Sequence, residues 1–118
     1  MIEFTLPIRT VNELNGSHGR SHWPTTKRRK AQREAVKKAL NGKTLPPLPI
    51  SVLCVRIGGR GLDRHDGLPG SFKSIIDEIA EAYGLPDNDP RFDWKYDQEK
   101  AKRGVYGVRI KIQPRGET

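Results

Sequence analysis

Carboxylate side chains gather in one segment of this 118-residue chain, between residues 61 and 93. The segment contains Asp63, Asp66, Asp77, Glu78, Glu81, Asp87, Asp89 and Asp93. Carboxylates attract Mg²⁺, a hard cation that takes a few oxygen ligands from the protein and the others from water and phosphate. A bound Mg²⁺ can stabilise the charge on a phosphodiester under attack and ionise the attacking water. The acidic segment is therefore a candidate site for metal-dependent phosphodiester chemistry.

The rest of the chain is strongly basic, which makes the acidic segment stand out. Residues 1–60 hold twelve lysines and arginines against three acids, a charge of +9, whereas residues 61–118 hold ten against eleven, a charge of −1. A basic half suits a polyanionic partner, because each cation that neutralises a phosphate releases a condensed counterion. Acids beside a phosphate would repel it unless a metal ion bridges the two. The two charge patterns together favour a metal-dependent enzyme that acts on nucleic acid.

Length and composition predict a single folded domain over residues 1–118. The one cysteine, Cys54, excludes an internal disulfide and a thiolate metal site, and its apolar neighbours in "ISVLCVRI" indicate a buried thiol. The opening "MIEFTLPIRT" lacks the apolar core of a signal peptide, and no apolar run is long enough to cross a membrane. We therefore expect a cytoplasmic protein without a membrane partner.

Hydrophobic periodicity predicts the element order β-α-β-α-β-β. The strands are expected at residues 2–6, 50–57, 92–99 and 105–112, and the helices from Thr25 or Thr26 to Leu40 and from about Leu68 to Tyr83. The strand at 50–57 is apolar on both faces, which predicts a central place in the sheet. The fold class is therefore predicted as α+β, a mixed sheet with helices packed on it.

These elements determine where the acids would lie. Asp63 and Asp66 fall in the loop between the central strand and the second helix, and Asp87 and Asp89 fall in the loop after that helix. Lys73 is expected about two turns into the helix and one turn before an acid, Asp77. A lysine in that position can neutralise the charge that develops on the phosphate or orient the attacking water.

Each of these residues also has a purely structural interpretation. Asp66 could cap the second helix, with a proline in the first turn. Asp87 and Asp89 could be turn formers beside Pro86 and Pro90. The pair of Lys73 with the acid one turn later could be an exposed i,i+4 ion pair worth a few tenths of a kcal/mol. A D-x-x-D spacing is common and does not decide between these interpretations.

The first helix is the predicted surface for phosphate. One stripe of it is apolar, while basic residues surround the rest, so much of the helix must face solvent or DNA. The predicted DNA contacts are Arg20 in the preceding loop and Lys27, Arg28, Arg29, Lys30 and Arg33 on the helix.

The chain resembles the RusA-like family of Holliday junction endonucleases. The resemblance begins at "FTLPIRTVNELNGSHGRSHW" and is most specific in "LDRHDGLPGSFKSIIDEIAEAYGLPDNDPRFDWKYDQEK". In this family an aspartate pair precedes a leucine, a helix carries a lysine and then an aspartate four residues later, and an acidic turn precedes a strand. The matching residues are Asp63 and Asp66 for the pair, Lys73, Asp77, and Asp89 for the turn.

The match departs from the family pattern in two places. The pair is spaced by one residue more, in "DRHDGL", with Gly67 where the enterobacterial member of the family has asparagine, and three extra residues separate the pair from Lys73. In the turn, Asp87 competes with Asp89, and we prefer Asp89 because it stands directly before "PRF".

The resemblance implies cleavage of branched DNA, namely four-way junctions, by a homodimer that depends on Mg²⁺, with Mn²⁺ able to substitute. It implies metal binding by Asp63, Asp66 and Asp89 with Asp77 close behind, and catalysis by Asp63, Asp66, Lys73 and Asp89. Two other functions remain open from the residues themselves. One is a non-catalytic DNA-binding module on the same fold, and the other is a basic RNA-associated protein without chemistry.

A homodimer also follows from the substrate, because a four-way junction is nearly two-fold symmetric and one acidic cluster can make only one nick per encounter. Three large aromatic residues, Trp23, Trp94 and Tyr96, are candidates for the interface. The alternative is that the tryptophans belong to the core of the monomer.

Overall fold

The computed structural model of the protein describes residues 1–8, 22–58, 72–102 and 104–115, with the backbone alone for residues 22–28. The elements in these ranges are β1 (Ile2–Leu6), α2 (His22–Leu40), β2 (Ile50–Gly58), α4 (Lys73–Ala82), β3 (Phe92–Lys100) and β4 (Gly107–Pro114). The order β-α-β-α-β-β is the predicted one. The last strand begins two residues later than expected and runs two residues further.

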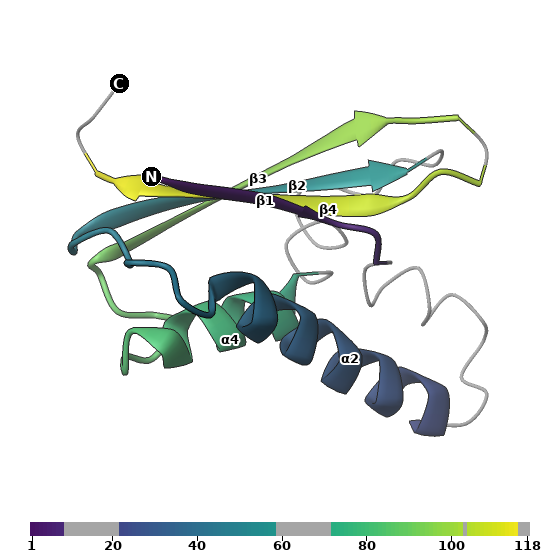
Figure 1. The fold of residues 1–118 in the computed structure, drawn as a ribbon, viewed down its shortest axis with the longest axis horizontal. Coiled ribbons are helices and arrows are strands. Elements are labelled where there is room, and N and C mark those ends of the chain that lie inside the picture. Colours follow the sequence, from purple (N-terminus) through teal and green to yellow (C-terminus); the bar gives the residue numbers. More distant parts are fainter. Residues whose placement is uncertain (9–21, 59–71, 103, 116–118) are drawn as a thin grey trace.

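The four strands form one mixed sheet in the order β1-β4-β2-β3 (Figure 1). Strand β4 pairs antiparallel with both β1 and β2, while β2 and β3 are parallel. Cys54 of β2 lies between Ile110 of β4 and Tyr96 of β3 in this register. The predicted central position of β2 is therefore confirmed, because a strand lies on each side of it.

Helices α2 and α4 lie on the same face of the sheet, and the hydrophobic core lies between the two layers (Figure 1). Alternate strand residues such as Val52 and Ile110 face the helices and are fully buried. Val36 of α2, and Ile75 and Ile79 of α4, are equally buried from the opposite side. The predicted α+β class, a mixed sheet with helices packed on it, is confirmed. Burial raises the pKa of the Cys54 thiol, as expected for a cysteine in this core.

Helix α2 begins at His22, three or four residues earlier than the predicted cap at Thr25 or Thr26. Pro24 lies in its first turn, where a missing backbone N–H costs nothing because such groups have no helical partner. The helix ends at Leu40 as predicted, and Gly42 follows with a φ of 76°. Neither of the helices that the structure describes is long and apolar enough to span a membrane.

Helix α4 begins at Lys73, so the predicted start near Leu68 is wrong. Phe72 occupies the N-cap position and is fully buried. Asp66, the residue that could have capped this helix, lies outside the described residues. Gly70 and Ser71 have low helix propensity, which disfavours an earlier start. Lys73 is therefore the first residue of the helix and does not lie two turns into it.

Replacement of a core residue and of its neighbour on the other face tests the alternation of β4. Ile110→Ala should lower the free energy of unfolding by about 2–5 kcal/mol, because it leaves a cavity in a packed core. Lys111→Ala, on the other face of the same strand, should change it by less than about 0.5 kcal/mol. Urea unfolding of both variants makes the comparison, and equal losses would contradict the assigned faces.

Candidate functional site

Lys73 joins the start of α4 to the loop that follows the same helix. Its Nζ lies 3.0 Å from Oδ1 of Asp77 and 2.9 Å from Oδ2 of Asp87. The hydrogen bond to Asp87, and then the one to Asp77, raise the pKa of the Lys73 ammonium. All three side chains are partly exposed to solvent, with 60% of the lysine side chain accessible. This cluster contains two residues of the predicted acidic site, Lys73 and Asp77, together with Asp87, the acid that competed with Asp89 for the role in the turn.

The loop after α4 is held so that Asp87 lies beside this lysine. Leu85 N donates to Ala80 O at 3.1 Å, which ties the start of the loop to the helix. The indole Nε1 of Trp94 donates to the backbone oxygen of Asp87 at 2.8 Å. The Trp94 ring also packs against Phe92, with ring centroids 5.1 Å apart. A residue of β3 thus fixes the backbone that carries one of the two acids.

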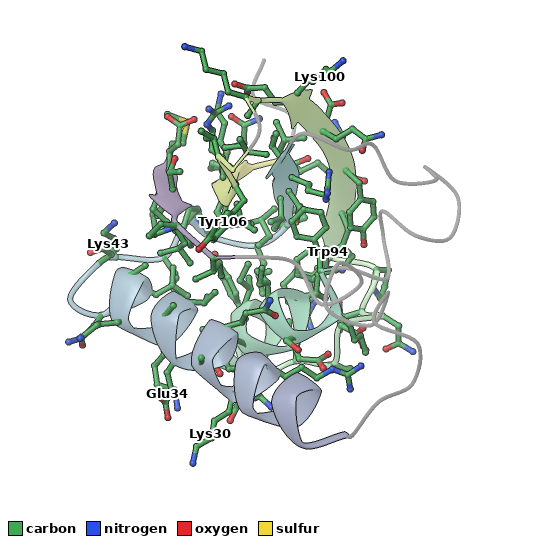
Figure 2. The ribbon with its side chains drawn as sticks, turned by 90° about the vertical axis from the view of Figure 1, so that its right-hand side faces the viewer. Lys30, Glu34, Lys43, Trp94, Lys100 and Tyr106 are labelled. Atoms are coloured by element: carbon green, nitrogen blue, oxygen red, sulfur yellow. The ribbon has the colours of Figure 1, made fainter. Side chains whose placement is uncertain are left out.

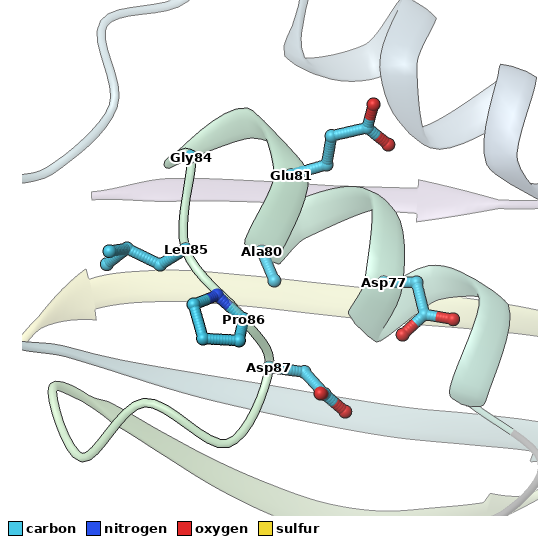
Figure 3. Close-up of a pocket in the computed structure, with 7 residues that line it drawn as sticks. All are labelled: Asp77, Ala80, Glu81, Gly84, Leu85, Pro86 and Asp87. Carbon is cyan, nitrogen blue, oxygen red and sulfur yellow. The ribbon is translucent and has the colours of Figure 1, made fainter.

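A cavity of about 380 Å³ lies between α4 and this loop. Its lining residues are Asp77, Ala80, Glu81, Gly84, Leu85, Pro86 and Asp87. Figure 3 shows the carboxylates of Asp77 and Asp87 directed to the same side, while Glu81 points away from them. The cavity therefore has an acidic end, and Lys73 contacts both acids at that end.

Asp89 is engaged by a different partner, Arg91. Arg91 donates to it from Nε at 2.9 Å, from Nη2 at 3.0 Å and from its backbone N at 2.9 Å. The hydrogen bond from the arginine side chain is the main reason why the pKa of the Asp89 carboxyl falls to about 2. The preference for Asp89 over Asp87 gains no support from this geometry. An aspartate two residues before an arginine is a local signal in the sequence that could have identified this ion pair.

Several predicted site residues lie outside the described residues. Asp63, Asp66 and Arg20 belong to this group, and the side chains of Lys27 and Arg28 lie outside it as well, although α2 includes both positions. In the described ranges, no group of three or more His, Cys, Asp or Glu side chains is placed to hold a metal ion. The described cluster around Lys73 therefore consists of two carboxylates and one ammonium.

The remaining predicted DNA contacts on α2 differ from one another. Arg29 and Lys30 are exposed, and Figure 2 shows Lys30 directed away from the sheet. Arg33 instead reaches α4, where its Nε lies 3.1 Å from Oε1 of Glu78 and its Nη2 pairs with Glu81. The Glu78 side chain is only 6% exposed. Arg33 thus links α2 to α4 through ion pairs, and two carboxylates already neutralise its charge.

Both aromatic residues of β3 that were candidates for an interface pack on the core. Trp94 and Tyr96 are partly buried against it, and the Tyr96 ring lies 5.9 Å from that of Phe72. For Trp94, these contacts support the alternative that the tryptophans belong to the core of the monomer. The side chain of Trp23 lies outside the described residues.

Arg56 is a buried charged residue that was not among the predicted site residues. It lies near the end of β2 with 2% of its surface exposed, and its side chain is among the largest that are fully buried. A Cβ on Gly58 would lie 3.2 Å from its Nη2, so the neighbouring glycine leaves room for the guanidinium. A charged residue inside an apolar central strand was the signal that could have identified it.

Comparison of the chain with protein-family models finds no match, and none of the curated proteins matches it significantly. The resemblance to the RusA-like family therefore stays a prediction. Any function has to be argued from the residues and contacts of this chain.

Replacement of Arg33 tests whether this residue links the two helices or contacts phosphate. Arg33→Ala should lower the free energy of unfolding by about 1–3 kcal/mol, because the buried Glu78 loses a charged hydrogen bond. Lys30→Ala on the exposed side of the same helix should cost less than about 0.5 kcal/mol. Chemical unfolding and DNA titration of both variants give the answer. A stable Arg33→Ala protein with weaker DNA binding would make Arg33 a DNA contact.

The hydrogen bonds from Arg91 predict a low titration midpoint for the Asp89 carboxyl. Its folded-state pKa of about 2 lies below the ordinary value of 3.8, so the ionised carboxylate stabilises the fold above about pH 4. That contribution should be lost as the pH falls from 4 towards 2. NMR titration of the carboxyl carbon should show a midpoint near 2, which Arg91→Ala moves up to about 3.9 and Lys95→Ala leaves in place. An unmoved midpoint in Arg91→Ala would exclude the arginine as the cause.

Proposed function

We propose that this protein is a divalent-cation-dependent endodeoxyribonuclease that cleaves four-way DNA junctions. The observation that carries the proposal is the cluster in which Lys73 brings Asp77 and Asp87 together at the start of α4. The segment with Asp63 and Asp66 joins the end of β2 to this same point. Asp77 of the helix and Asp87 of the loop after it thus contact one lysine in a chain of net charge +8.

The donor chemistry of the cluster fits a divalent cation. Carboxylate oxygens are the donors that Mg²⁺ and Mn²⁺ accept, and Asp77 and Asp87 already share one cation, the Lys73 ammonium. The proposed ligands are these two aspartates together with Asp63 and Asp66. Asp87 takes the place predicted for Asp89, because Arg91 holds the oxygens of Asp89. When bound, the cation would neutralise phosphate charge and acidify water at the site.

Lys73 is the proposed donor to the phosphate. The ammonium is protonated at neutral pH, as for an ordinary lysine, and the two aspartates raise its pKa further. It can therefore donate a hydrogen bond to a phosphate oxygen whose charge increases during attack. Its place at the first residue of α4 adds the partial positive charge of the helix N-terminus. The two aspartates hold the ammonium in position before the substrate arrives.

The exposed basic residues of α2 are the proposed contacts to the phosphates of the DNA backbone. Arg29, Lys30, Lys37 and Lys38 are exposed, and each phosphate that they neutralise releases a counterion. Arg33 is left out of this surface because α4 engages it. This basic face would serve equally in a DNA-binding module without chemistry, which is the alternative function.

The proposed nuclease is a homodimer. Resolution of a four-way junction requires paired nicks in opposed strands, and a two-fold dimer is the simplest assembly that supplies two equivalent sites. Each chain contributes one cluster around Lys73.

Cleavage of a synthetic four-way junction tests the function directly. We expect paired nicks in the presence of Mg²⁺ or Mn²⁺, and none with a chelator. Asp66→Asn should abolish cutting while junction binding stays intact or strengthens, because one repulsive charge is removed. Tight binding without cleavage under any divalent cation would favour the non-catalytic module, and full activity of Asp66→Asn would remove that residue from the site.

Lys73 should act on turnover more than on binding. Lys73→Ala is expected to lower the cleavage rate constant by about 10²-fold or more with little change in junction affinity, as for loss of one charge-stabilising donor. Lys95→Ala, another exposed lysine, serves as the control and should keep its activity. Single-turnover cleavage and binding titrations separate the two effects. Equal losses of affinity and rate would make Lys73 an ordinary phosphate contact.

The two aspartates of the turn form a matched pair for identifying the ligand. Asp87→Asn should lower cleavage by at least about 10²-fold, since it removes a proposed metal ligand and a partner of Lys73. Asp89→Asn changes the same charge two residues away and should keep most of the activity. Cleavage rates across a range of Mg²⁺ concentrations decide between them. The reverse order of effects would restore Asp89 as the ligand.

A further inference from the structure

The ammonium of Lys73 already occupies the position of a cation between two carboxylates. Its Nζ lies 3.0 Å from Oδ1 of Asp77 and 2.9 Å from Oδ2 of Asp87, so one donor group connects α4 to the loop that follows it. Each acid contributes one oxygen to this contact. The protein thus places a cation of its own between the two acids that the proposed function assigns to a metal ion.

The lysine keeps the two acids together. Figure 3 shows the carboxylates of Asp77 and Asp87 directed to the same side of the cavity between α4 and the loop. Two carboxylates in such an arrangement repel each other, and a positive group that contacts both offsets the repulsion. The pair of acids is therefore assembled while no metal ion is bound.

The contacts that hold the ammonium are weak enough to exchange. The side chain of Lys73 is 60% exposed, and ion pairs between exposed side chains contribute little free energy. Among the residues that the structure describes, Asp77 and Asp87 are the only acids that pair with this ammonium. The first residue of a helix is also an unfavourable place for a positive charge. Once the acids have another partner, nothing described here keeps the ammonium on them.

We propose that Lys73 is an exchangeable cation, which holds Asp77 and Asp87 in the metal-free protein and gives them up to a divalent cation. The ammonium then leaves the acids, and its flexible four-carbon stem lets it turn to a phosphate of the DNA. This inference rests on the proposed function and adds a regulation to it. The lysine becomes available to the substrate only when the acids have received their metal ion.

The charges balance in this exchange. Two carboxylates and one divalent cation are neutral together, and so are one ammonium and one phosphodiester. If the ammonium stayed on the acids, the same cluster would hold a divalent cation beside a second positive charge, which repels it. Because coupling between two ligands is reciprocal, a phosphate that receives the ammonium should in turn raise the affinity of the acids for the metal ion.

Mn²⁺ binding to the metal-free protein tests the exchange without any nuclease assay. Lys73→Met should bind Mn²⁺ about three-fold or more tightly than the wild type, because no ammonium competes for the two acids. Lys95→Met removes the same charge from another exposed ion pair, the one with Asp93, and should bind Mn²⁺ as the wild type does. Electron paramagnetic resonance of the free ion gives the three dissociation constants.

A second measurement separates exchange from simple repulsion between two cations. In the wild type, the ¹⁵N signal of the Lys73 ammonium should move when Mg²⁺ is added and return when the ion is chelated. The expected direction is towards the position of this signal in metal-free Asp77→Asn/Asp87→Asn, where the two carboxylates are absent. The signal of Lys95 should stay in place.

Each outcome decides about the exchange, and the outcomes treat the proposed function differently. Equal or weaker Mn²⁺ binding by Lys73→Met, or an unmoved Lys73 signal in the presence of bound Mg²⁺, would overturn the exchange and leave the metal site standing. Binding by Lys73→Met but not by the wild type would support it, because the ammonium then excludes the ion. Binding by neither protein would overturn the exchange together with the metal-dependent function.

Discussion

Burial of strand β2 is the constraint on which the rest of the structure depends. The strand is apolar on both faces, and Ile50, Val52 and Cys54 are fully buried. Each buried aliphatic side chain of this size contributes about 1.5–3 kcal/mol, which makes the covering of this strand a dominant stabilising term. Helices α2 and α4 cover one face, and β4 and β3 pair with its two edges.

The position of the candidate site follows from the same strand. Helix α4 returns beneath the sheet after β2 and begins at Lys73, where the helix dipole disfavours a cation. Hydrogen bonds from Lys73 to Asp77 and Asp87 offset that cost and raise the pKa of the lysine. A cation held by two acids at an unfavourable position is typical of a site whose local arrangement serves function more than stability. Two acids of the acidic segment, Asp77 and Asp87, are thus held by one lysine.

Features that depend on local periodicity could be predicted from the sequence. The two apolar faces of β2 predicted its central place in the sheet, and the alternation of apolar and basic residues predicted β4. The start of α4 was misplaced because Pro69 suggested a first turn, whereas the following glycine and serine disfavour a helix. A local pattern determines these boundaries to within a few residues only.

Features that depend on contacts between distant residues could not be predicted. Asp87 lies beside Lys73 because Trp94 holds its backbone oxygen, and the fold alone brings that indole to the loop. Arg33 looked like its basic neighbours on α2, and its partner Glu78 is 45 residues away in the sequence. Side chains of equal charge on one helix therefore have different roles, which only the packing of that helix against α4 distinguishes.

The central claim is that the acids around Lys73 hold a divalent cation. Titration of the metal-free protein with Mn²⁺, followed by the electron paramagnetic resonance of the free ion, tests it most directly. The double variant Asp77→Asn/Asp87→Asn should bind Mn²⁺ at least about ten-fold more weakly than the wild type, because it removes two oxygen ligands of the ion. Asp93→Asn/Asp97→Asn, which removes the same charge from strand β3, should bind as the wild type does. Equal Mn²⁺ affinity in all three proteins would contradict the claim.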